Sequence, residues 1–222
     1  MPPYLILIRG KTMVATCNQI LDIINIAARR LGEKRGISTE SATNAISEMT
    51  AAYPIIRDKL IRSYNWACCI KEDTFAFKEM IVNPVYNEKQ YVYALPADCL
   101  GIISINGMIT GYSGTERIEH ENPPYKIRGN VIYTKFEPPL HVEYKYRNDN
   151  VTSYDANFCD VLAWDIAIDC CHRIKQDESL LGRMLKMRDD AIDLALQAQA
   201  IETPARPKPT GNWLRARKIE FI

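Results

Sequence analysis

A short stretch near the middle of the chain, YVYALPADCLG at residues 91–101, predicts two β-strands joined by a tight corner. Tyr91, Tyr93 and Leu95 alternate with small or β-branched residues, which is the period of a strand with one buried face. Pro96 ends that strand because proline has no N–H for a ladder hydrogen bond. Since helical spacing dominates before about residue 75 and returns after about residue 153, the chain must combine helices and strands in one fold.

Two helical segments are predicted before the strands. Thr16 and Gln19 have the spacing of a capping box, and apolar residues follow at helical intervals until Gly32, a natural helix terminator. The second segment begins near Ser38, and Pro54 must either kink it or start a new helix. Its predicted buried stripe is Ala42, Ala45, Ile46, Met49, Ala52, Tyr53, Ile56, Leu60, Tyr64 and Ala67.

Charged residues on these two helices are expected to face solvent. The polar face of the second helix carries Arg57, Asp58, Lys59 and Arg62. Asp58 and Arg62 are four residues apart, which predicts an ion pair within the helix. A basic cluster at the end of the first helix would either stabilise the negative end of the helix dipole or face DNA. This cluster is Arg29, Arg30, Lys34 and Arg35.

Strand patterns dominate from Phe75 to Arg147. Gly129 and Asn130 can adopt the positive φ angles of a tight hairpin turn. Residues 141–147 alternate between charged and apolar side chains, which predicts a strand with one wet face and one aromatic face. The sequence therefore places a β domain between two groups of helices.

Two further helices are predicted, from Ala156 to about Lys175 and from Ser179 to about Ile201. Apolar residues cover more than one face of the first, so we expect it to be central. The predicted buried stripe of the second is Leu181, Met184, Ala191, Leu194, Ala195 and Ala198.

The predicted fold class is α+β, an antiparallel bundle of about four helices with an inserted antiparallel β domain and an extended C-terminal arm. The expected limits are an N-terminal arm or edge strand at 1–12, the first part of the bundle at 13–74, the β domain at 75–152, the second part of the bundle at 153–202 and the arm at 203–222.

Composition excludes some classes of function. The 28 Lys and Arg residues nearly balance the 27 Asp and Glu residues, so a global attraction to DNA or to an anionic membrane is not supported. No apolar run reaches the ~18 residues that a membrane helix needs. Seven cysteines without a secretory signal favour free thiols in a reducing compartment. We expect a soluble protein made in the cytoplasm.

The sequence contains no catalytic constellation that we would defend. Cys170, Cys171 and His172 are the most enzyme-like cluster, but adjacent residues on a helix point about 100° apart, so thiol and imidazole would not face each other. Glycine-rich phosphate loops and cysteine pairs with zinc spacing do not occur. We therefore expect no enzymatic activity, no cofactor and no metal.

The C-terminal arm is the segment whose composition most clearly predicts a partner. Pro204, Pro207 and Pro209 disfavour a helix. A disordered tail rarely keeps so many large apolar residues, although a simple tail is the alternative. Trp and Arg are enriched at binding hot spots. The predicted partner-binding residues are Arg206, Lys208, Trp213, Leu214, Arg215, Arg217 and Phe221.

Three motifs in series resemble the tail tubular protein A family, the head–tail adaptors of short-tailed bacteriophages. They are YPIIRDKLIRSYNWA at 53–67, LPADC at 95–99 and YDANF at 154–158, and the resemblance spans roughly Met13 to Glu202. It implies a virion protein in a ring of twelve subunits between the portal protein and the tubular protein of the tail nozzle. Genomic DNA would pass through the lumen of that ring.

A second hypothesis comes from a different class of protein, a nucleic-acid-binding regulator. It would use the first two helices to bind DNA and the basic C-terminal arm to clamp phosphates. The near-neutral charge and the absence of a short glycine-containing turn before a polar recognition helix argue against it. We therefore expect a structural protein whose partners are the portal, the tail and copies of itself, with no membrane.

Overall fold

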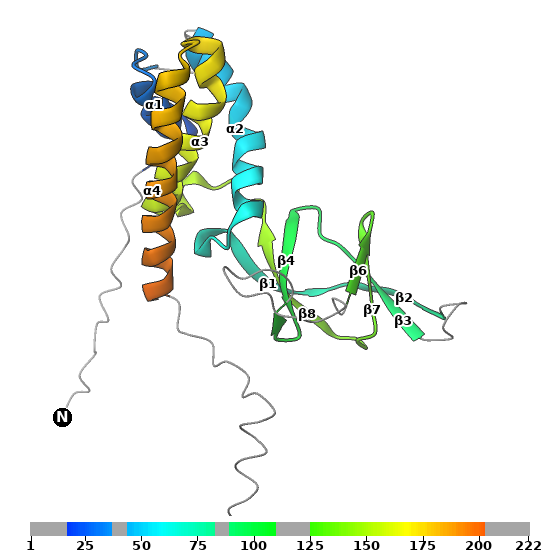
Figure 1. Ribbon diagram of the computed structural model, residues 1–222. Coiled ribbons are helices and arrows are strands. Elements are labelled where there is room, and N and C mark those ends of the chain that lie inside the picture. The colour runs from blue at the N-terminus through cyan, green and yellow to red at the C-terminus, as the bar shows by residue number, and fades with distance from the viewer. Residues whose placement is uncertain (1–16, 37–43, 83–88, 110–124, 203–222) are drawn as a thin grey trace, which may run out of the picture.

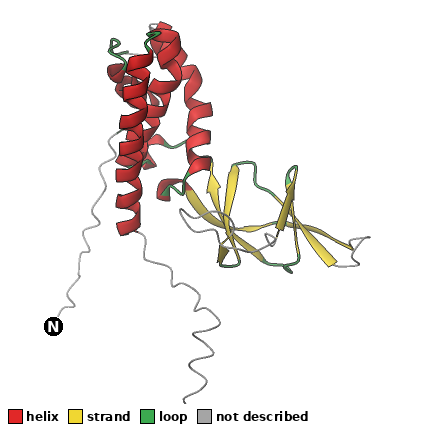
Figure 2. Cartoon of the chain, viewed as in Figure 1, coloured by secondary structure: helices red, strands yellow, loops and turns green. Residues whose placement is uncertain are grey.

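The computed structural model describes residues 17–36, 44–82, 89–109 and 125–202. These residues form a mixed α+β protein with four α-helices and two antiparallel sheets, which confirms the predicted class. The helices lie together at one end of the molecule and the strands at the other (Figures 1 and 2). The predicted segment 1–12 and the C-terminal arm, 203–222, lie outside the described residues.

Helix α3 is the centre of the helical part. The four helices are α1 (Ile20–Arg30), α2 (Asn44–Ser63), α3 (Ala156–Ile174) and α4 (Glu178–Glu202). Helices α1, α2 and α4 each pack against α3, and α1 also packs against α2. Nine residues of α3 are buried, because its apolar residues point toward three neighbours instead of one.

The ends of the helices follow local sequence signals. Asp22 accepts hydrogen bonds from the backbone N–H groups of Asn18 and Gln19, each at 3.0 Å, so the N-terminal cap of α1 forms around this carboxylate. Gly32 has a φ of 69°, the left-handed conformation that ends a helix, as predicted. Pro54 lies inside α2, which continues as one helix from Asn44 to Ser63.

The β domain consists of two four-stranded antiparallel sheets. The first has the order β1 (Ile70–Phe75), β8 (Leu140–Tyr146), β4 (Cys99–Ile105) and β5 (Met108–Ile109). The second has the order β2 (Phe77–Val82), β3 (Lys89–Ala94), β7 (Val131–Thr134) and β6 (Tyr125–Arg128). The two sheets share one core, whose buried residues are Phe75, Tyr91, Tyr93, Ile105, Ile132, Leu140, Val142 and Tyr144.

The predicted corner after Tyr93 is present, but it does not form a hairpin. Strand β3 ends at Ala94 and β4 begins at Cys99, so Pro96 lies between strands that belong to different sheets. The hairpin at Gly129 is confirmed, because it joins β6 to β7 with a φ of 59°. The predicted alternation in β8 is also confirmed, since Leu140, Val142 and Tyr144 are buried and His141 is exposed.

Candidate interaction surfaces

Helix α4 has the least covered surface of the four helices, because its main contact is with α3. Met184, Ile192 and Ala195 are its buried residues. Arg188 Nε donates a hydrogen bond to Asp165 Oδ1 on α3 at 2.8 Å, at the edge of the same contact. The two faces of α4 that flank its contact with α3 remain open to solvent.

One side of α4 carries a row of exposed apolar residues, which we call the apolar stripe. Met187, Leu194 and Ile201 are 51%, 65% and 86% exposed. They are seven residues apart, so they lie on one side of the helix, two turns from one to the next. The prediction that Leu194 is buried is wrong, because α4 packs mainly on α3 and this row lies to the side of that contact.

The other side of α4 borders a hollow of about 220 Å³, which we call the α2–α4 groove. Leu185, itself exposed, forms part of its wall, and α3 forms its floor. The groove is lined by Ile56, Lys59, Leu60, Ser63, Asp165, Ile168, Asp169, Leu185 and Arg188. Helix α4 therefore separates an exposed apolar stripe from a partly apolar groove.

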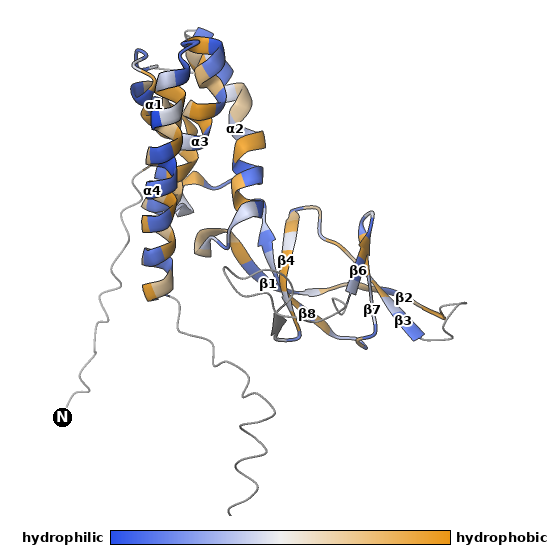
Figure 3. Cartoon of the chain, viewed as in Figure 1, coloured by the Kyte–Doolittle hydropathy of each residue, from blue (hydrophilic) through white to orange (hydrophobic). Residues whose placement is uncertain are grey.

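This arrangement leaves apolar surface that the chain itself does not bury. Figure 3 shows hydrophobic positions along α4 down to its C-terminal end. Full burial of one such side chain is worth roughly 1.5–3 kcal/mol, so a row of three is a substantial driving force for association. Contiguous apolar patches on a protein surface mark interaction sites more often than isolated residues do.

A second exposed apolar surface lies on the β domain. Strand β2 is at the edge of its sheet, with β3 on one side only. Phe77, Met80 and Val82 on this strand are all exposed. Open edges with apolar side chains are sites where another chain can add a strand or pack a side chain.

Polar contacts join the helical part to the β domain, and we call them the polar junction. The guanidinium of Arg57 binds Asp58 Oδ1 through Nε at 2.9 Å and Nη2 at 2.8 Å, and it also contacts Asp149. Asp58 Oδ2 accepts a hydrogen bond of 2.8 Å from Arg147, which follows β8. Asp58 therefore links α2 to the end of β8.

Two sequence predictions fail at the polar junction. Arg57 is buried, at 6% exposure, and it does not face solvent. The sequence predicts that Asp58 pairs with Arg62, but it binds Arg57 and Arg147 instead. Burial disfavours the charge on Arg57, but the hydrogen bond and the negative charge of Asp58 outweigh it and raise the pKa of the guanidinium. The signal that could have shown this is the spacing of Arg57 from Tyr53, four residues earlier on the buried stripe.

Buried hydrogen bonds extend the polar junction below the helices. The Asn148 side chain donates to the carbonyl of Cys68 at 2.7 Å and to the hydroxyl of Ser153 at 2.8 Å. Tyr154 donates to the carbonyl of Asn148 at 2.6 Å. Because buried polar groups are costly to leave unpaired, these contacts fix the direction in which the chain leaves β8 and enters α3.

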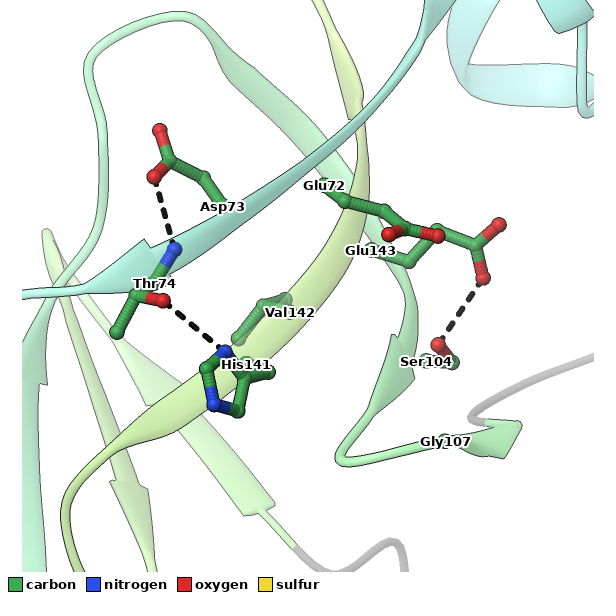
Figure 4. A pocket seen from close by; sticks show the side chains of 8 residues that line it. All are labelled: Glu72, Asp73, Thr74, Ser104, Gly107, His141, Val142 and Glu143. Carbon is green, nitrogen blue, oxygen red and sulfur yellow. Dashed lines mark hydrogen bonds between the residues drawn. The ribbon is translucent and has the colours of Figure 1, made fainter.

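A hollow on the β domain, about 650 Å³ in volume, is acidic and open (Figure 4). Glu72 on β1 lies directly opposite Glu143 on β8, an unfavourable pairing of like charges. Ser104 donates to Glu143 at 3.0 Å, and the hydroxyl of Thr74 lies 3.0 Å from His141 Nδ1 (Figure 4). Among the described residues, no group of three or more His, Cys, Asp or Glu side chains is arranged to hold a metal ion.

The cysteine–histidine cluster on α3 divides between core and solvent. Cys170 and Cys171 are buried and His172 is exposed. Burial raises the pKa of Cys170 to about 11 and also raises the pKa of Cys171, so both thiols stay protonated at neutral pH. All seven cysteines are free in the structure.

Within the basic cluster of α1, Arg30 is held by α3. Its guanidinium donates to the carbonyl of Asp160 at 2.8 Å and forms an ion pair with the carboxylate of that residue. It also stacks over the ring of Trp164, 3.8 Å from the ring centre. Arg30 therefore packs the helices together and is not available to face DNA.

The predicted partner-binding residues of the arm, Arg206, Lys208, Trp213, Leu214, Arg215, Arg217 and Phe221, lie outside the described residues. Compared with models of known protein families and with curated proteins, the chain matches none of them. Across the parts of the chain that the structure describes, none of the helices has the length and apolar character needed to cross a membrane.

Proposed function

We propose that this chain is a structural subunit of a ring, the head-to-tail adaptor between the portal and the tail of a short-tailed bacteriophage. The observation that carries the proposal is that α4 presents the apolar stripe on one side and the α2–α4 groove on the other. In a closed ring each subunit meets its two neighbours through two different surfaces. A helix with two unlike open sides supplies such a pair.

The two-part architecture supports the same proposal. The resemblance to the tail tubular protein A family implies an antiparallel helical bundle with an inserted β domain, and the strands here lie between α2 and α3. The helices would form the ring, and the β domain would face the tubular protein of the tail. The exposed edge strand β2, with Phe77, Met80 and Val82, is the surface that we assign to that partner.

The remaining partners follow from the ring itself. The arm residues named above would bind the portal or a neighbouring subunit, and the genome would pass through the lumen. A formal net charge of +1 suits such a passage, because strong phosphate binding would hold the DNA in place. The regulator hypothesis is less well supported, since Arg30 of its basic cluster is bound to α3.

The proposal is tested by mixing the purified chain with the portal protein encoded by the same genome. Negative-stain electron microscopy should then show portal particles with an added ring on one face. Portal particles that stay unchanged, together with a gel shift of double-stranded DNA by the chain alone at moderate salt, would support the regulator and contradict the adaptor.

A further inference from the structure

The two open sides of α4 complement each other. We infer that the apolar stripe of one copy of this chain docks in the α2–α4 groove of the next copy, with the two α4 helices running in the same direction. This inference deepens the ring proposal and rests on it, because it specifies which surfaces meet between neighbouring subunits.

The shapes of the stripe and the groove agree with this docking. Ala191 and Ala198 alternate with the stripe residues Met187, Leu194 and Ile201, which gives the 3–4 spacing of one helix of a coiled coil. Small residues between large ones let a second helix approach closely. The groove volume of about 220 Å³ exceeds the ~150 Å³ of a cavity that accepts benzene, so it has room for an aliphatic side chain.

Ion pairs between the helices show how the helices are oriented relative to one another. Glu48 at the start of α2 pairs with Arg173 at the end of α3, so these two helices are antiparallel. Arg188 of α4 pairs with Asp165 of α3, and α4 follows α3 after a short connection, so these two are antiparallel as well. Helices α2 and α4 therefore run in the same direction on either side of the groove.

The charges beside the stripe match those beside the groove. Arg183 lies four residues before Met187, and Asp190 lies four residues before Leu194. Both charged residues therefore lie beside the apolar stripe on the surface of α4. The groove carries Asp169 on α3 and Lys59 on α2. Within the described part of the chain, these four exposed residues have no ion-pair partner.

The spacing of these charges selects the parallel arrangement. The Glu48–Arg173 ion pair marks one level on α2 and α3. In the same direction from that level, Lys59 lies eleven residues further on α2 and Asp169 lies four residues away on α3. Lys59 and Asp169 are therefore about 10 Å apart along the helix axes. Arg183 and Asp190 are seven residues apart, also about 10 Å at 1.5 Å per residue. A parallel α4 thus places Arg183 next to Asp169 and, at the same time, Asp190 next to Lys59. An antiparallel α4 would instead place Asp190 next to Asp169 and Arg183 next to Lys59, which are pairs of like charge.

Parallel docking is also what a ring requires. Rotation about an axis along the helices keeps their direction, so each neighbour presents its α4 with the same polarity. A two-fold contact between two stripes would instead reverse the direction of α4 and give closed dimers. The two arrangements predict different behaviour when two charge variants are mixed.

The test uses Arg183→Glu, which alters the stripe side, and Asp169→Arg, which alters the groove. Wild-type self-association is measured by sedimentation velocity up to about 1 mM, where weak complexes still form. Each variant alone should associate at least about tenfold more weakly, because like charges meet. Their equimolar mixture should recover wild-type association, since every stripe then meets a groove of opposite charge.

Two further variants separate docking from folding. Met187→Ser should weaken association at least about tenfold, because pairing Arg183 with Asp169 places Met187 one turn further along, inside the groove. Ile127→Ser, at an exposed apolar residue on β6, should leave it unchanged. Circular dichroism melting curves must show that all variants are folded.

Several outcomes would overturn the inference: a wild-type chain that stays monomeric at the highest concentration, unchanged association of the single variants, or no recovery on mixing. A portal-bound ring made by Arg183→Glu alone would also overturn it and leave the adaptor function standing. Recovery on mixing in solution, without any ring on the portal, would support the docking and contradict the adaptor.

Discussion

Asp58 on α2 and Arg147 after β8 are joined by a hydrogen bond of 2.8 Å that crosses from the helical part to the β domain. The same carboxylate holds the buried Arg57 through its other oxygen, Oδ1. One aspartate therefore neutralises a buried guanidinium and fixes the strand that returns to the helices. In the adaptor that we propose, such a junction would keep the two parts in one orientation.

Removing this carboxylate should destabilise the whole chain. Asp58→Ala leaves Arg57 buried with Asp149 as its ion-pair partner, and loss of one member of a buried charge pair costs about 3 kcal/mol. Asp149→Ala should cost no more than about 1 kcal/mol, because the side chain of Asp149 is 74% exposed. Urea unfolding of both variants measures the difference, and equal losses would show that Asp58 has no special role.

Two residues of α4 should behave in opposite ways in the folded monomer. Ile192 is buried against the helical core, so Ile192→Ala should lower the free energy of unfolding by about 2–4 kcal/mol. Leu194, two residues on, is exposed, so Leu194→Ala should change it by less than about 0.5 kcal/mol. Thermal unfolding at low concentration checks both. A large loss in Leu194→Ala would mean that this residue packs within its own chain.

The features that the sequence predicts correctly depend on local chemistry. The alternation of β8 requires one buried face of a strand, and Gly129 supplies a positive φ that other residues adopt at a cost. The end of α1 at Gly32 is of the same kind. These features need no knowledge of which distant segment packs nearby.

The features that the sequence misses depend on distant partners. The buried Arg57 binds Asp149, and its neighbour Asp58 binds Arg147, both some ninety residues later in the chain. Leu194 is exposed because α4 packs mainly on α3, while periodicity alone suggests a broad buried face. The groove has contributions from three helices, so no single window of sequence contains it. The candidate surfaces could be found only once the packing of α4 was known.

Burial of Cys170 predicts a loss of stability at high pH. Its pKa is raised from 9.0 to about 11 in the folded chain, because burial disfavours the thiolate. Below pH 9 the thiol is protonated in both states and its contribution to stability is complete. As the pH rises from 9 to 11 the unfolded chain loses this proton first, so the contribution is lost over that window.

The matched variant for this effect is Cys170→Ala. Between pH 9 and 11 the free energy of unfolding of the wild type should fall by about 2–3 kcal/mol more than that of Cys170→Ala. The reason is that the pKa of the thiol is about 11 in the folded chain and 9.0 in the unfolded chain. Urea unfolding at several pH values measures both curves. Parallel curves would show that the Cys170 thiol does not titrate in this window.

The last prediction concerns the arm, residues 203–222, as a partner-binding segment. Truncation after Glu202 should leave the free energy of unfolding unchanged within about 0.5 kcal/mol, because the buried contacts of α4 all lie before its end at Glu202. The same truncation should abolish binding to the portal. Trp213→Ala should weaken portal binding more than Lys208→Ala does, because a buried aromatic ring contributes more than an exposed charge. Surface plasmon resonance measures portal binding of each variant. Full binding by the truncated chain would show that the arm is not part of the portal interface.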